Sequence, residues 1–156
     1  MAAEVRIVVF EETRVAALEH RGPEYLIGDS VRAFIAWRRQ NGLPPKSSAT
    51  FNILHDRATG SPPWEYRIDI CAATDRGVPE NSLGIVEKTI PGGRCAVLRH
   101  VGPDDTLGAA VKHLLATWLP SSGEERRDFP IFIQRVSFFP DVREDEAVID
   151  VFLPLM

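Results

Sequence analysis

The sequence predicts an α+β fold made of a duplicated β-α-β-β unit, with pseudo-two-fold symmetry between the copies. Residues 14–37 and 94–117 align without a gap at an offset of 80 positions. Each copy then continues into two more apolar segments joined by a turn-rich link. One helix per copy can cover only one face of a sheet. We therefore expect an antiparallel sheet with helices on one side and a central groove where the copies meet.

Identical residues recur at matching positions of the two copies. They include Ala16 and Ala96, Leu18 and Leu98, His20 and His100, Gly22-Pro23 and Gly102-Pro103, Gly28 and Gly108, and Val31 and Val111. A chance match of this length in register is improbable. We place the copies at about 5–73 and 85–153, joined by a linker over 74–84, within a single domain that spans residues 1–156.

Each copy begins with extended chain that is rich in β-branched and apolar residues, as strands are. The segments are 5–10 and 14–20 in the first copy, and 84–90 and 94–100 in the second. Pro91-Gly92-Gly93 predicts a turn between the last two segments. The first strand of a copy is therefore expected to bend.

A helix is expected after each Gly-Pro pair, because proline is tolerated in a first helical turn and acidic residues there favour the helix dipole. Apolar residues follow at i, i+4, i+7 and i+8, which predicts one-sided helices that lie on a sheet. They are Ile27, Val31, Phe34 and Ile35, and then Leu107, Val111, Leu114 and Leu115. The first helix is expected to end at Asn41-Gly42 and the second before Pro120.

Two strands complete each copy. They are expected at 50–56 and 64–73 in the first copy, and at 131–138 and 146–153 in the second. Asp69 matches Asp150 at an offset of 81, so the repeat extends to the last strand.

Composition narrows the function classes. Hydrophobic residues make up 44% of the chain and charged residues 26%, as in globular proteins. The net charge of −4 argues against nucleic acid as a partner, and no apolar run reaches the roughly 18 residues of a membrane helix. The N-terminus lacks the pattern of a secretory signal. We expect a cytoplasmic protein, monomeric or dimeric, with Cys71 and Cys95 as free, buried thiols.

Strand alternation places candidate ligand-binding residues on one sheet face. Arg67, Asp69 and Cys71 are expected on the face that the helix does not cover, and so are Asp150 and Phe152. The acids could bind a cationic amphipathic ligand. The alternative is a solvated strand face on which Arg67 pairs with one of the acids.

Histidine and aromatic side chains also allow either a binding role or a structural one. His20 and His100 are expected to hold the turn at a strand end, since they recur as a pair and show no ligand spacing for a metal. Trp64 and Tyr66 could stack on a ligand at the rim of a groove, or pack in the core. No metal site, cofactor motif or catalytic triad is visible.

The motifs RCAVLRHVGPDD (94–105) after IPGG (90–93), WEYRIDICAA (64–73), WLPSSGEERRDFP (118–130) and IDVFLPL (149–155) occur in an order that resembles a known family. The chain is similar to the GyrI-like small-molecule-binding domain, also known as the AraC-type effector-binding domain. The resemblance implies a groove for amphipathic, often cationic or aromatic compounds, and a stand-alone form of a domain that multidrug-responsive regulators carry beside DNA-binding modules. Other stand-alone members are gyrase inhibitors or hydrolases of cyclopropane-bearing alkylators.

The resemblance also exposes one departure. Where the family's penultimate strand carries a groove glutamate followed by a tyrosine, this chain has Ile133 and Arg135. Either the groove accepts a neutral or anionic ligand, with Asp150 as the remaining acid, or a one-residue shift puts Gln134 in the groove instead.

We therefore expect a non-enzymatic domain that binds a small amphipathic or aromatic molecule without a cofactor, as a sensor or a sequestering protein. Two alternatives stay open: a toxin hydrolase with Asp150 as general base, and a module that binds a protein such as gyrase or a regulator. The expected ligand-binding residues are Asn52, Trp64, Tyr66, Asp69, Cys71, Ile133, Arg135, Asp150 and Phe152.

Overall fold

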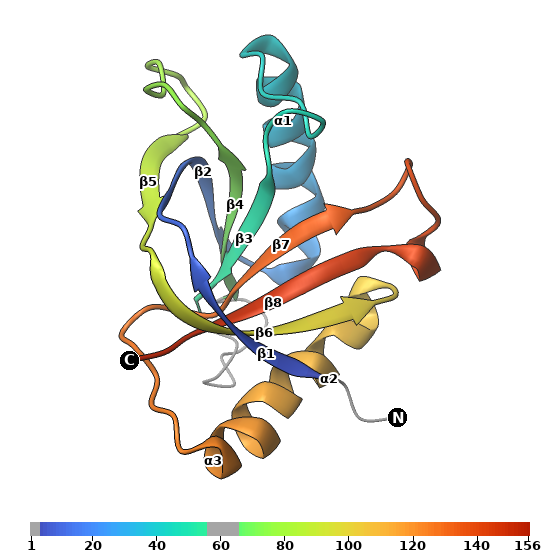
Figure 1. The fold of residues 1–156 in the computed structure, drawn as a ribbon. Helices are drawn as coiled ribbons and strands as arrows, with labels where there is room; N and C mark the ends of the chain where they lie inside the picture. Colours follow the sequence, from blue (N-terminus) through green and yellow to red (C-terminus); the bar gives the residue numbers. More distant parts are fainter. Residues whose placement is uncertain (1–3, 56–65) are drawn as a thin grey trace. The chain divides into compact units, whose positions relative to one another are not determined.

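The structure is a computed structural model, described here for residues 4–55 and 66–156 (Figure 1). The chain divides into two compact units. Unit I comprises Met1–Glu11 and Gly92–Met156, and unit II comprises Glu12–Pro91. Within the described residues, each unit contains four strands and a helical segment, so the predicted α+β class is confirmed.

Unit II is an antiparallel sheet with one long helix. Its strands lie in the order β3 (Thr50–Leu54), β4 (Tyr66–Ala73), β2 (Thr13–Gly22) and β5 (Val86–Ile90). Helix α1 (Ile27–Gln40) follows a 3₁₀ turn, and it ends where the Asn41-Gly42 pair predicts.

Unit I has the same plan. Its strands lie in the order β1 (Val5–Phe10), β6 (Gly93–Val101), β8 (Val148–Pro154) and β7 (Phe132–Ser137), all antiparallel. Its helical segment runs from α2 (Leu107–Lys112) through a π-helical stretch, η4 (His113–Trp118), to α3 (Leu119–Ser122).

The first strand of each sequence repeat pairs outside its own repeat. β1 opens the first repeat but pairs with β6 of the second, with Val8 opposite Cys95. β5 opens the second repeat but pairs with β2 of the first, with Lys88 opposite Val15. The expected bend is thus a break into two strands, and each repeat contributes one strand to the unit built by the other.

The end of the second helical segment differs from the prediction. Helix continues past Pro120 to Ser122, and Gly123 ends it with a φ of +77°. A proline lacks the N–H that an interior helical position donates. Here Pro120 stands in the first turn of α3, directly after the wider π-helical turn, where the hydrogen-bond spacing of the helix changes.

The core of unit II lies between α1 and the sheet. Phe34 and Trp37 stack with ring centroids 5.8 Å apart and pack on Ala16, Ile70 and Ala72. All five side chains are buried. Burial of each large side chain stabilises the fold by roughly 1.5–3 kcal/mol, so Phe34 and Trp37 determine which sheet face the helix covers. Ile35 of the predicted stripe is 46% exposed, and Trp37 is buried in its stead.

A buried arginine joins this core to the link after α1. Arg38 is 4% exposed, and its guanidinium donates to the carbonyls of Leu43 and Ser48 at 2.7 and 2.8 Å and to Thr50 Oγ1 at 2.8 Å. Burial lowers the pKa of Arg38 to about 10. The side chain therefore fixes residues 43–50 by supplying donors that buried acceptors need.

The paired histidines hold the turns before the helices, as predicted. His20 Nε2 donates to the Pro23 carbonyl at 3.2 Å, while its Nδ1 lies 2.9 Å from Ser30 Oγ. His100 Nε2 donates to the Pro103 carbonyl, also at 3.2 Å.

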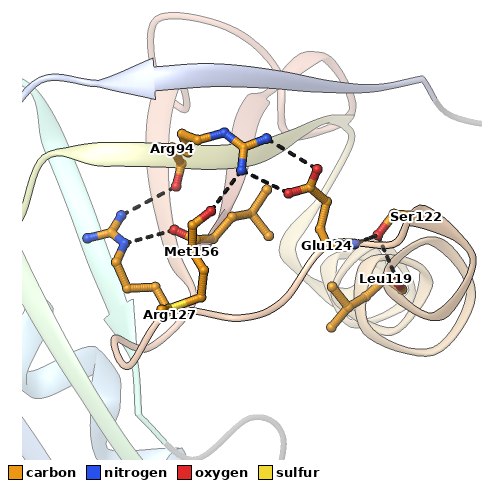
Figure 2. Close-up of polar contacts among 7 residues, drawn as sticks. Arg94, Leu119, Ser122, Glu124, Arg127 and Met156 are labelled. Atoms are coloured by element: carbon orange, nitrogen blue, oxygen red, sulfur yellow. Dashed lines mark hydrogen bonds and ion pairs between the residues drawn. The ribbon is translucent and has the colours of Figure 1, made fainter.

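Arginines anchor the last strand of unit I (Figure 2). Arg94 donates to both oxygens of Glu124 at 2.9 and 3.2 Å and to the carbonyl of Met156 at 2.7 Å. Arg127 donates to the carbonyls of Leu155 and Arg94 at 3.2 and 3.4 Å. The segment after α3 is thereby tied to both β6 and the end of β8.

Candidate functional site

Strand register sorts the predicted site residues into two faces, because directly opposite residues of an antiparallel pair lie on the same side. In unit II, Ile70 and Ala72 pack toward α1, so Asp69 and Cys71 lie on the opposite side. We call that side the Asp69 face. Its members are Val15, Ala17, Glu19, Arg21, Phe51, Ile53, His55, Arg67, Asp69, Cys71 and Lys88.

The Asp150 face of unit I is defined in the same way. Its members include Arg6, Val8, Phe10, Cys95, Val97, Arg99, Val101, Phe132, Gln134, Val148, Asp150, Phe152 and Pro154.

Asp69 is at the centre of an ion-pair network. Its Oδ2 accepts from His55 Nε2 at 2.9 Å and from Lys88 Nζ at 2.8 Å. Lys88 also donates to Glu19 Oε2 at 2.7 Å. Burial alone would raise the pKa of Asp69, which is 2% exposed, but the bonds from His55 and Lys88 outweigh burial and lower it. Asp69 is therefore ionised and already paired.

Lys88 responds to the same network in the opposite direction. Burial would lower the pKa of its ammonium, but the hydrogen bonds to Asp69 and Glu19 raise it. One cation from β5 thus bridges two acids that stand directly opposite each other on β2 and β4.

Asp150 is paired by a different arrangement. Arg99, directly opposite on β6, donates its Nε to Oδ1 at 2.8 Å and its Nη2 to Oδ2 at 3.0 Å. This bidentate geometry is the strongest form of an arginine–carboxylate contact. Asp150 is 8% exposed, whereas half of the Arg99 side chain remains exposed.

An aromatic cluster lies on the same face as Asp150. Phe132 and Phe152 stack with centroids 4.8 Å apart and an interplanar angle of 4°, and Phe10 meets both edge-on at 4.9 and 5.3 Å. Phe129 adds an edge contact to Phe132 at 6.1 Å. Phe10 and Phe129 are partly exposed, so the cluster presents aromatic surface at its margin.

Register separates the remaining predicted residues from the acids. Gln134 stands opposite Asp150, so Ile133 and Arg135 point to the other side of the sheet. Arg135 is paired there with Asp104 through two hydrogen bonds of 2.9 and 2.8 Å. Of the two registers that the sequence allowed, the structure has the one that puts Gln134, not Ile133, beside Asp150.

Two of the residues predicted in unit II also lie on the helix side. Asn52 is opposite Ile70, and its Nδ2 donates to the backbone carbonyl of Asp69 at 3.3 Å. Tyr66 is opposite Gly22 and alternates with Arg67, which places it on the side of Ile68 and Ile70. Trp64 lies outside the described residues.

The cysteines are free and buried, as predicted. Burial raises the pKa of both thiols, that of Cys71 well above its usual range. Neither thiol is therefore an activated nucleophile at neutral pH, since the thiolate is the reactive form.

A hollow of about 280 Å³ lies in unit II between the end of α1 and the chain that follows β4. Its lining includes Trp37, Leu43, Val78 and Pro79 and none of the predicted site residues. It belongs to the helix side of the sheet. In the described part of the chain, no helix is long and apolar enough to cross a membrane.

Sequence reasoning missed the side chains that pair with the two acids. Lys88, Arg99 and His55 were not predicted, because their contacts depend on which strands are neighbours. Alternation within β6 does assign Arg99 to the face of Asp150, so this partner could have been found from the sequence. Alternation within β2 likewise assigns Glu19, the second acid that Lys88 contacts, to the face of Asp69.

A sheet face with clustered aromatic rings and a few paired charges has the composition of a small-molecule-binding surface. The chain belongs to the GyrI-like small molecule binding domain family, which it matches over residues 3–156. It is 36% identical over 156 residues to the probable transcriptional regulator YgiV of Escherichia coli strain K12, covering 99% of this chain and 98% of that protein.

Solved structures show the same fold at low identity. The C-terminal domain of EcmrR superposes with a TM-score of 0.82 at 16% identity, over 100% of this chain and 99% of that one. In the EcmrR–DNA complex, this chain spans 57% of the EcmrR chain, with a TM-score of 0.79 at 15% identity. The structure of SAV2435 bound to tetraphenylphosphonium superposes with a TM-score of 0.56 at 9% identity, over 98% of this chain and 94% of that one.

Proposed function

We propose that this chain is a single, cytoplasmic effector-binding domain that holds a small amphipathic or aromatic molecule without transforming it. The ligand is proposed to bind in the groove that the sequence duplication predicts. Family membership supports small-molecule binding, and a 36% identical relative described as a probable transcriptional regulator supports a sensing role. A ligand sensor is therefore preferred to a sequestering protein.

The aromatic cluster of the Asp150 face is the observation that carries this proposal. Phe10 and Phe129 leave part of their rings exposed beside the buried stack of Phe132 on Phe152. Aromatic rings that reach the surface in a fixed arrangement can cover a planar or apolar ligand with little loss of side-chain entropy. Burial of such a ligand contributes about 25 cal/mol per Å² of apolar surface removed from water.

The paired acids argue against a hydrolase. A general base works best with a pKa near the working pH, and the bonds from His55 and Lys88 instead lower the pKa of Asp69. Both oxygens of Asp150 are held in a bidentate pair by the guanidinium of Arg99. Their pairing suits them to holding the sheet faces in shape rather than to activating water.

Titration with the neutral dye N-phenylnaphthylamine tests the proposal. Saturable fluorescence enhancement with one site per chain is expected. Phe10→Leu should weaken binding several-fold, because it removes an edge-on ring from the cluster without touching its buried stack. Phe139→Leu is the matched control, since Phe139 is 65% exposed.

If Phe10→Leu and Phe139→Leu leave the affinity equally unchanged, the aromatic cluster is not the binding surface. Native mass spectrometry of the purified chain should in addition show a co-purified molecule of small mass. Conversion of a cyclopropane alkylator that depends on Asp150 would replace this proposal with the hydrolase.

A further inference from the structure

Two arginines face each other across adjacent strands of unit II. Arg21 on β2 is directly opposite Arg67 on β4, at the end of the Asp69 face. Like charges at directly opposite positions of an antiparallel pair are destabilising. Arg21 is exposed and Arg67 is half-buried, so both can be reached from solvent, from which an anion can supply the compensating negative charge.

Neither guanidinium is compensated within the described chain. Over residues 4–55 and 66–156, no carboxylate pairs with Arg21 or Arg67. The Nε of Arg67 is buried and has no hydrogen-bond acceptor in this part of the chain. A buried donor without an acceptor is uncommon in native proteins and indicates an absent partner.

The acids nearest in the sheet are already engaged. Glu19 and Asp69 form the next opposite pair on the same face of β2 and β4, and both accept from Lys88. Asp69 also accepts from His55. The Asp69 face thus carries three permanent cations against two acids, and the two unmatched guanidinium groups are at one end of it.

The fold itself does not require these arginines. In unit I the equivalent positions are Val101 on β6 and Val148 on β8, which are also directly opposite each other. An apolar pair therefore occupies the equivalent positions in the sheet of unit I. The arginine pair is a specific feature of unit II.

We propose that Arg21 and Arg67 together bind the anionic group of the ligand, a carboxylate, sulfonate or phosphate carried on an apolar body. This inference rests on the proposed function and specifies the class of its ligand. Each planar guanidinium can donate two parallel bonds to an oxyanion, and the Nε of Arg67 gains the acceptor it lacks. The preferred ligand is then an organic anion, not a lipophilic cation.

Two dyes that differ by one charged group test this directly. Anilinonaphthalene sulfonate has the ring system of N-phenylnaphthylamine with a sulfonate added. The wild-type chain should bind the sulfonate dye more tightly than the neutral one. The double variant Arg21→Val with Arg67→Val should lose roughly 10- to 100-fold of the affinity for the sulfonate dye, while the affinity for the neutral dye changes by less than about two-fold.

The valine variant copies the pair that unit I already contains, so its fold should be retained, and an unchanged circular dichroism spectrum checks this. Arg32→Gln with Arg39→Gln is the charge-matched control. It removes two exposed arginines from α1, outside the Asp69 face, and should leave both affinities unchanged. Arg21→Gln with Arg67→Gln should repeat the selective loss.

Equal effects of the arginine substitutions on both dyes, or no effect on either, would overturn the anion site while leaving dye binding, and thus the proposed function, intact. The anion site is also overturned if the control pair lowers sulfonate affinity as much as the test pair, since net charge alone would then explain the loss. If the wild-type chain binds neither dye, the proposed function fails and this inference fails with it.

Discussion

Asp69 and Asp150 occupy equivalent positions on β4 and β8, yet the two units neutralise them with cations from different strands. Across from Asp150 stands Arg99, which pairs with it in bidentate geometry. Across from Asp69 stands another acid, Glu19, and the cation is Lys88 from β5. The repeated fold thus preserves a buried acid at this position, while the two units differ in the charge that surrounds it.

This difference can be tested by introducing the charge arrangement of unit II into unit I. Val8 on β1 is the equivalent of Lys88 on β5, because Val8 stands opposite Cys95 as Lys88 stands opposite Val15. Arg99→Glu should destabilise the chain by about 1 kcal/mol or more, since it places two acids in direct opposition. Adding Val8→Lys should recover most of this loss by copying the arrangement of unit II.

Urea denaturation of the two single variants and the double variant measures the coupling between them. A favourable interaction energy between the substitutions is expected. Strict additivity would mean that β1 and β5 do not hold equivalent places in the two sheets.

Lys88 itself should contribute measurably to stability. Lys88→Met leaves Glu19 and Asp69 opposed without a shared cation, and we expect a loss of about 1–2 kcal/mol. This lies below the roughly 3–5 kcal/mol of a fully buried pair, because the Lys88 side chain is 27% exposed. Arg14→Gln, which breaks the exposed pair with Glu87, is the control and should leave the urea midpoint unchanged. Equal midpoints for the two variants would contradict the bridging role.

The ion-pair network of Asp69 should also appear in the pH dependence of stability. The folded chain lowers the pKa of Asp69 below its unfolded value of about 3.9. Its stabilising contribution is therefore complete above the unfolded pKa and is lost as the pH falls through the lower folded value. Asp69→Asn should flatten the acid limb of the stability curve below about pH 5.

Asp75→Asn is the matched control for that measurement. It makes the same change in formal charge at a carboxylate whose side chain is 95% exposed. Its acid limb should follow that of the wild-type chain. If both variants titrate alike, Asp69 does not carry the acid dependence.

The sequence predicted those features that depend on residues close to one another in the chain. The burial of Phe34 on α1, the end of that helix at Asn41-Gly42 and the hydrogen bonds of His20 to its own turn are all local. Ile35, which the same pattern placed on the buried side of α1, is 46% exposed. Strand alternation also assigned Asp69 correctly to the side away from the residues that pack on α1, and it put Asp150 on the side opposite to Ile149 and Val151. Local periodicity was enough for each of these.

Features that depend on strand pairing could not be predicted from the sequence. A shift of one residue moves a whole strand to the other face, and the pattern of β7 allowed either choice. The stack of Phe132 on Phe152 accompanies the register that puts Gln134 beside Asp150. The pairing of β1 and β5 with strands of the other repeat could not be predicted for the same reason. A sequence repeat shows which segments are alike, but not which segments pair.

Arg38 is a case in which a charge inside the core stabilises the fold without an acid. Arg38→Met removes donors from the buried carbonyls of Leu43 and Ser48, and a lost bond to a charged donor typically costs about 1.5–3 kcal/mol. We expect a destabilisation of at least about 2 kcal/mol, seen as a lower urea midpoint. Arg38→Lys should recover little of it, because an ammonium cannot reach three acceptors with the geometry of a planar guanidinium.

Arg39→Met, one residue along on the exposed side of α1, should change stability by less than about 0.5 kcal/mol. If the Arg38→Met and Arg39→Met variants unfold at the same urea midpoint, the hydrogen bonds of Arg38 do not hold the link between α1 and β3.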